Sequence, residues 1–216
     1  DALFITDPFN MRYISGFRGE GILYISAKQQ VLITDSRYTE AAMKESDFVV
    51  TEENRDNKRT DILKSCIQQD GTEVLGYEDC SMLCSEYAKF SKELPVKQWI
   101  PREQSGNDLR QIKTPEELEY LRKAESIGDA AFAAILGFLK PGITELEVAA
   151  QLEYEMKRNG AEGFSFDAII ASGVHSSMPH AMPDEKKLEY GMISRKKSMM
   201  WFFAPRRRRL RLSVPA

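Results

Sequence analysis

The sequence predicts an α/β protein in two parts, a first domain with a mixed sheet and flanking helices and a second part that opens with two helices. Short β-rich runs alternate with helical runs through the first hundred residues, which is typical of a layered α/β domain. A polar stretch then precedes a strong helix start at Thr114. The 216 residues suit two modest domains, because domains commonly span about 100–150 residues.

Six short runs that are rich in β-branched and aromatic residues predict strands. Two of these runs are separated only by residues 27–29, which indicates an antiparallel hairpin, so the sheet is expected to be mixed. The six predicted strands are Ala2–Thr6, Gly21–Ser26, Gln30–Thr34, Phe48–Glu52, Val74–Tyr77 and Gln98–Pro101.

Three helices are predicted between these strands, at Ser36–Glu45, Lys58–Gln69 and Ser81–Glu93. The first is preceded by Asp35, a residue type that commonly caps a helix N-terminus. We prefer this capping role to a binding role for the polar and aromatic side chains in the same domain. The side chains in question are Tyr13, Asp35, Arg37 and Tyr38.

The polar stretch defines the expected domain boundaries. It contains a glycine and few apolar residues, so we place a linker at residues 106–114. This divides the chain into a first domain of residues 1–105, a second of residues 115–192, and a basic tail of residues 193–216.

Two helices are expected after the linker. The first has Thr114 as its N-cap and Pro115 at its first position, and it runs to about Leu139 with an apolar side from Leu118 to Phe138. The second opens with a capping box at 144–147 and ends near residues 157–158, before Asn159 and Gly160. A strand at Phe166–Ala171 and a polar loop containing both histidines of the chain should follow.

Composition limits the class of protein. A hydrophobic content of 42% allows a sizeable core and argues against global disorder. No apolar run approaches the roughly 18–20 residues of a membrane span and no leader opens the sequence, so we expect a cytoplasmic protein without a membrane partner.

Reduced thiols are expected at the three cysteines, Cys66, Cys80 and Cys84, and a metal site at the last two is disfavoured. Because Ala2–Thr6 begins as a strand already under way, the natural N-terminus is expected upstream.

Charge is distributed unevenly along the chain. Residues 1–192 contain 22 basic and all 33 acidic residues, a net charge of −11, whereas residues 193–216 carry +8. Clustered arginines beside apolar residues suit a membrane surface or a nucleic acid. We favour a third explanation, that the reading frame is lost near Gly191 or Met192, so that the tail is aberrant and no nucleic-acid partner is expected.

Several motifs, in a consistent order, resemble the aminopeptidase P / Xaa-Pro dipeptidase family over residues 1–192. In the first domain, the motifs lie near its start, at the end of the second strand of the predicted hairpin, and at its C-terminal end. In the second domain, they extend up to the loop that contains the histidines. The segments are Asn10–Phe17, Thr34–Tyr38, Ile112–Glu117, Gly142–Ala149, Gly160–Asp167, Ala171–Gly173 and Pro179–Ala181.

This resemblance implies a creatinase-like N-terminal domain followed by a pita-bread α+β catalytic domain, which is incomplete here. It also implies two divalent ions, manganese or cobalt, held by two Asp, one His and two Glu, that activate a water for attack on the scissile carbonyl. In the family the first ligand follows shortly after the segment matching Lys186–Gly191. Because no Asp, Glu or His follows Gly191, we expect this chain to bind no catalytic metal.

The resemblance also implies roles for residues near the loop. His180 matches a family histidine that contacts substrate and stabilises the tetrahedral intermediate, so it is the candidate catalytic and substrate-binding residue. Phe166 is a candidate substrate-binding residue, and core packing is the alternative for it and for Phe164. His175 stands where relatives often carry Asn, and we interpret it as a solvated loop residue.

The expected activity of the intact protein is hydrolysis of the bond between an N-terminal residue and proline in proline-containing peptides, with a homodimer as a further expectation. The chain by itself is expected to be inactive. One alternative is a non-catalytic binding module that reuses the creatinase-like domain. Another is a creatinase-type hydrolase that works without metals.

Overall fold

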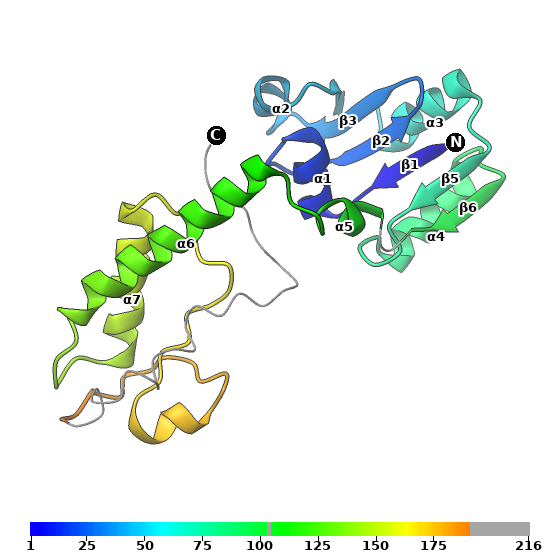
Figure 1. The fold of residues 1–216 in the computed structure, drawn as a ribbon. Helices are drawn as coiled ribbons and strands as arrows, with labels where there is room; N and C mark the ends of the chain where they lie inside the picture. Colours follow the sequence, from blue (N-terminus) through cyan, green and yellow to red (C-terminus); the bar gives the residue numbers. More distant parts are fainter. Residues whose placement is uncertain (103–104, 191–216) are drawn as a thin grey trace. The chain divides into compact units, whose positions relative to one another are not determined.

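The computed structural model describes residues 1–102 and 105–190, so the basic tail lies outside the described residues. The chain divides into two compact units, Asp1–Ile112 and Lys113–Ala216 (Figure 1). None of the described helices combines the length and the apolar composition that a membrane-spanning segment requires.

The first unit is built on a six-stranded sheet with the order β4-β3-β2-β1-β5-β6 (Figure 1). Strand β2 is antiparallel to β1 and β3, and the other neighbouring pairs are parallel, so the predicted mixed sheet and hairpin are confirmed. Each of the six predicted strands is present, with bounds that differ by at most one residue. The strands are β1 Ala2–Ile5, β2 Ile22–Ser26, β3 Gln30–Asp35, β4 Val49–Glu53, β5 Val74–Tyr77 and β6 Gln98–Pro101.

Five helices accompany this sheet in the described part of the first unit: α1 Pro8–Ser15, α2 Thr39–Glu45, α3 Arg59–Asp70, α4 Cys84–Glu93 and α5 Ser105–Leu109. Helices α2, α3 and α4 were predicted, although α2 and α4 begin three residues later than expected. The sequence prediction missed α1, which Asp7 caps by accepting hydrogen bonds from the N–H groups of Phe9 and Asn10. It also missed α5, which lies partly in the segment that we expected to be a linker.

The predicted capping role of Asp35 is wrong. Helix α2 begins at Thr39, its N-cap residue is Tyr38, and no side chain caps it. Asp35 is instead the last residue of β3, and its carboxylate accepts hydrogen bonds from the backbone N–H and the guanidinium of Arg37. A charged guanidinium competes for the carboxylate more effectively than a helix N–H group, because both partners of that hydrogen bond are ionised.

Apolar side chains are buried on both faces of the sheet. Phe4 and Tyr24 pack with Leu63 of α3 and other residues on one face. Leu23 and Leu32 lie in a second cluster that includes residues of α1 and α2. Because successive side chains of a strand point to opposite faces, burial on both faces explains the nearly continuous apolar runs of β2 and β3.

The described part of the second unit contains α6 Pro115–Leu136, α7 Glu145–Arg158 and a short 3-10 helix, η1 Gly173–Ser177. Capping boxes begin both long helices, as the sequence predicts. Helix α6 ends three residues earlier than expected. Its buried face starts only at Ile127, whereas Leu118 is 40% exposed, so the predicted apolar stripe is buried only along the second half of the helix.

The predicted strand at Phe166–Ala171 is wrong, because no strand forms there. Ile170 is buried in the core between α6 and α7, which explains the apolar pattern without strand pairing. A strand also needs a neighbouring backbone to complete its hydrogen bonds, and no strand is assigned beside this segment within the described residues.

Candidate functional site

The first residue of α7, Glu145, is a fully buried carboxylate. Its Oε1 atom accepts hydrogen bonds from the N–H and the Oγ of Ser172, both at 2.7 Å. Its Oε2 atom lies 3.1 Å from Nδ1 of His175. The capping box of α7 fixes where the helix begins, and therefore which residue enters this buried position.

A lysine neutralises this buried carboxylate. The Nζ atom of Lys186 donates hydrogen bonds to the carbonyl oxygen and to the Oγ of Ser172, both at 2.6 Å, and lies 3.6 Å from Oε1 of Glu145. We call Glu145, Ser172, His175 and Lys186 the Glu145 cluster. A buried charge is tolerated when it is paired and hydrogen-bonded, and the cluster meets both conditions.

The contacts of the cluster determine the ionisation of Glu145 and the tautomer of His175. Burial opposes ionisation of Glu145, but hydrogen bonds from Ser172 and His175 outweigh it, so the pKa of Glu145 is lowered from its ordinary value. An ionised carboxylate can only accept hydrogen bonds, and Nδ1 of His175 must therefore carry the proton.

We expect the Glu145 cluster to lose its stabilising effect in acid. Because the folded-state pKa of Glu145 lies below the unfolded value of 4.5, the contribution is complete above pH 4.5 and is lost as the pH falls through the folded-state pKa. The contribution of Glu145 to stability can be measured by amide exchange of α7, compared between the wild type and Glu145→Gln. The difference between the two proteins should shrink as the pH falls below 4.5. A difference that stays constant down to about pH 3 would contradict this assignment.

Within the described residues, Glu145, His175 and Asp184 form one group whose possible ligand atoms all lie within 4.8 Å of one another. This group does not fit a catalytic metal centre. Both oxygens of Glu145 already accept protein hydrogen bonds, and the ammonium of Lys186 would repel a cation. The sequence also lacks any Asp, Glu or His after Gly191, so the ligand set implied by the resemblance is not built by this chain.

The predicted site residues lie near the cluster in sequence. His180 is exposed and lies in a turn closed by a hydrogen bond from the N–H of Ala181 to the carbonyl of Met178, at 3.2 Å. Phe166 is 49% exposed, whereas Phe164 packs against the core of the second unit. The functional roles of His180 and Phe166 stay predictions.

His175 is not the solvated residue that the sequence suggested, because its side chain is only 24% exposed and contacts Glu145. The sequence analysis also missed Glu145, Ser172 and Lys186 as members of one cluster. Each of them resembles an ordinary polar residue of a helix start or a loop, and only the three-dimensional arrangement brings them together.

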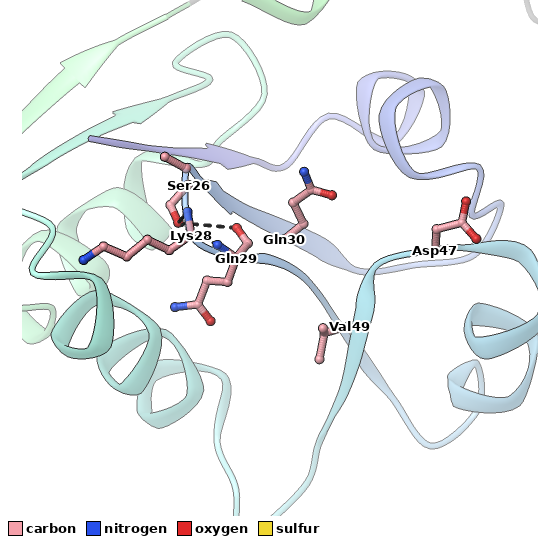
Figure 2. Close-up of a pocket in the computed structure, with 7 residues that line it drawn as sticks. Ser26, Lys28, Gln29, Gln30, Asp47 and Val49 are labelled. Carbon is pink, nitrogen blue, oxygen red and sulfur yellow. Dashed lines mark hydrogen bonds between the residues drawn. The ribbon is translucent and has the colours of Figure 1, made fainter.

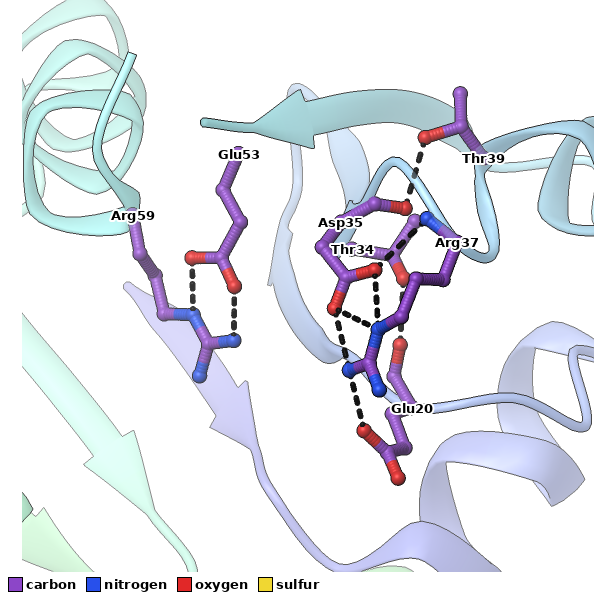
Figure 3. Close-up of polar contacts among 7 residues, drawn as sticks. All are labelled: Glu20, Thr34, Asp35, Arg37, Thr39, Glu53 and Arg59. Atoms are coloured by element: carbon purple, nitrogen blue, oxygen red, sulfur yellow. Dashed lines mark hydrogen bonds and ion pairs between the residues drawn. The ribbon is translucent and has the colours of Figure 1, made fainter. Parts of the chain in front are cut away.

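A second set of charged residues lies near the ends of β3 and β4 in the first unit (Figure 3). Arg37 pairs with Asp35 at 2.7 Å and with Glu20 at 3.0 Å, and Arg59 pairs with Glu53 at 2.5 Å. Hydrogen bonds from Arg37 lower the pKa of Asp35. Every carboxylate of this set has an arginine partner, which favours a structural role over binding of a ligand.

An open pocket of about 320 Å³ lies beside the β2–β3 turn (Figure 2). Its polar groups are largely occupied by local contacts. The Oγ of Ser26 accepts hydrogen bonds from the N–H groups of Lys28 and Gln29, and Nζ of Lys28 donates to the carbonyl of Asp70 at 2.6 Å. The lining residues contain no cysteine or histidine, and we do not interpret this pocket as a catalytic site.

The fold defines an α/β domain that is followed by two capped helices and a loop with both histidines of the chain. The family model of the creatinase/prolidase N-terminal domain matches residues 1–112, and that of metallopeptidase family M24 matches residues 119–195. The chain therefore belongs to the creatinase/prolidase and M24 metallopeptidase family, as its motifs predicted.

Named relatives support the same family. An uncharacterized peptidase, YqhT, of Bacillus subtilis is 39% identical, and a Xaa-Pro dipeptidase of Pyrococcus furiosus is 36% identical, each over 88% of this chain. A solved Xaa-Pro dipeptidase from Bacillus anthracis is 34% identical over the same share, with a TM-score of 0.81. The chain covers 54%, 53% and 53% of these proteins, respectively, so it spans about half of their length.

Proposed function

We propose that the intact protein is a metal-dependent Xaa-Pro peptidase that hydrolyses the bond between an N-terminal residue and proline. The observation that carries the proposal is the turn that contains Pro179, His180 and Ala181, linked to the Glu145 cluster by successive hydrogen-bonded turns in a chain whose relatives include Xaa-Pro dipeptidases. The proposed cofactors of the intact enzyme are two divalent ions, manganese or cobalt.

We also propose that this chain is inactive by itself. His180 offers an exposed imidazole that can donate a hydrogen bond to the oxygen of a scissile carbonyl. Hydrolysis additionally needs an activated water. The one group within the described residues that could hold a metal ion, Glu145, His175 and Asp184, already uses both oxygens of Glu145 in hydrogen bonds to the protein. His180 can therefore assist the reaction but cannot replace the missing nucleophile.

Hydrolysis of Xaa-Pro dipeptides tests both parts of the proposal. This chain and a version extended by the downstream coding sequence, read in each frame, would be assayed with manganese or cobalt, with and without a chelator. We expect no hydrolysis by this chain above the rate with metal alone. We expect hydrolysis by one extended version that contains two Asp, one His and two Glu as ligands, and the chelator should abolish it.

The other outcomes of this assay identify the alternatives. Hydrolysis by this chain alone would contradict its proposed inactivity. Hydrolysis that persists with the chelator would favour the metal-independent creatinase-type enzyme. No hydrolysis in any form would favour the non-catalytic binding module, which titration calorimetry with a Xaa-Pro dipeptide would then examine.

We further propose that the protein acts in the cytoplasm. This rests on its cysteines, because Cys66, Cys80 and Cys84 are all free, as expected for a reducing compartment. Proline-containing peptides are the proposed partners of the intact enzyme, and the homodimer stays a prediction.

A further inference from the structure

The loop that carries His180 is tied at both of its ends to the start of α7. At its beginning, the N–H and Oγ of Ser172 bind Glu145. At its end, the N–H of Glu145 donates to the carbonyl of Lys186 at 3.0 Å, and Nζ of Lys186 returns to Ser172. Residues 172–186 therefore form a closed loop whose two ends meet at one buried carboxylate.

Inside this loop, three hydrogen-bonded turns follow one another, each beginning where the previous one ends. The N–H of His175 donates to the carbonyl of Ser172 at 3.1 Å, and that of Met178 donates to the carbonyl of His175 at 2.9 Å. The N–H of Ala181 then donates to the carbonyl of Met178, and the buried Ala181 anchors this last turn. His180 lies within it, so a continuous series of hydrogen bonds runs from Glu145 to the turn that contains His180.

We propose that Glu145 is a positioning residue, which fixes the backbone of the turn that presents His180. Glu145 does not have to contact the substrate in this role, because it acts through Ser172 and His175. The importance of this role for catalysis rests on the proposed peptidase function. The effect of Glu145 on the position of the turn does not depend on that function.

A simpler role for Glu145, as a favourable charge at a helix N-terminus, does not explain its contacts. Thr144 and Glu147 already supply the capping box of α7. The hydrogen bonds that Glu145 accepts come instead from the loop, through Ser172 and His175. Burial of a carboxylate is costly, and here the loop contributes the donors that offset the cost.

The two histidines of the chain allow a direct test by nuclear magnetic resonance, because the ring nitrogens give only two sets of signals. Signals of His175 and His180, and amide exchange of residues 172–186, would be compared in the wild type and in Glu145→Gln. Glu147→Gln is the matched control, since it removes a carboxylate from the same helix turn while its amide oxygen can still accept the capping-box hydrogen bond from the N–H of Thr144.

In the wild type we expect neutral His175 to be protonated at Nδ1. In Glu145→Gln we expect loss of that tautomer preference, a shift of the His180 ring signals, and a rise of about tenfold in the exchange rates of Met178 and Ala181, the size expected when a charged hydrogen bond is lost. The control should retain the wild-type signals of both histidines. The proposal is overturned if Glu145→Gln speeds exchange at Ser172 alone and leaves the His180 signals unchanged.

Ser172→Ala provides a second test should Glu145→Gln fail to fold. It keeps the carboxylate and its bond to His175 but removes the hydroxyl that links Glu145 to Lys186. We expect faster exchange at Met178 and Ala181, and unchanged exchange at both would again overturn the proposal. Because these measurements need no catalysis, they separate failure of the positioning role from failure of the proposed peptidase function.

Discussion

Replacing Glu78 with alanine is expected to lower the free energy of unfolding of the first unit by about 3–5 kcal/mol. Glu78 directly follows β5 and is fully buried. Its Oε2 atom accepts hydrogen bonds from the N–H groups of Thr6 and Asp7, both at 2.7 Å, and its Oε1 atom accepts one from Nδ2 of Asn10 at 2.6 Å. Alanine would leave two donors of the β1–α1 connection and one of α1 without their charged acceptor, which costs more than the net value of three ordinary hydrogen bonds.

Glu78→Gln is the matched control for this prediction. Its amide oxygen can still accept the bonds from Thr6 and Asp7, and its NH₂ group can donate to Oδ1 of Asn10, which has no protein partner within the described residues. Such an exchange requires the amide of Asn10 to adjust, so we expect a loss of about 1–2 kcal/mol.

Urea unfolding measures both losses when it is followed by fluorescence in a Trp201→Phe background, where Trp99 of β6 is the only tryptophan. The expected order of stability is wild type, then Glu78→Gln, then Glu78→Ala. Equal losses for the two variants would mean that glutamine stabilises the unit no better than alanine does. The N–H groups of Thr6 and Asp7 would then be hydrogen-bonded to water in both variants, and the stabilisation by Glu78 would depend on its charge.

The sheet of the first unit was predictable because its signals are local and mutually consistent. Strands β2 and β3 consist mainly of apolar residues, and the connection of three residues between them is too short for anything but a hairpin. Likewise, the capping boxes at Thr144 and Thr114 place their acceptor and donor groups only three residues apart, so the sequence specifies the helix starts directly.

The failures arise where one sequence pattern has two physical outcomes. Asp35 could cap a helix or bind a guanidinium, and the position of Arg37 decided the outcome. The apolar run that ends at Ala171 satisfied the pattern of a strand, but burial of Ile170 between two helices satisfies it equally well. The Glu145 cluster was hidden for a third reason, since Glu145 and Lys186 are 41 positions apart and their pairing depends on the complete loop.

Replacing Gly16 with alanine is expected to destabilise the first unit by about 2–4 kcal/mol. Gly16 terminates α1 with a φ of +78°, a conformation in which a side chain is strained. A Cβ atom there would also lie 2.8 Å from the carbonyl oxygen of Glu45 at the end of α2. Because that atom belongs to the backbone, relief of the overlap requires movement of a helix end and not only of a flexible side chain.

Gly71→Ala separates the two contributions. Gly71 terminates α3 with a φ of +69°, but a Cβ atom there would meet nothing within 4 Å. Only backbone strain should therefore appear, about 1 kcal/mol in the same urea unfolding experiment. A larger loss at Gly16 would show that the ends of α1 and α2 are held firmly against each other. Equal losses at both glycines would mean that the carbonyl of Glu45 moves aside at little cost, and that the close approach at Gly16 does not restrict this part of the unit.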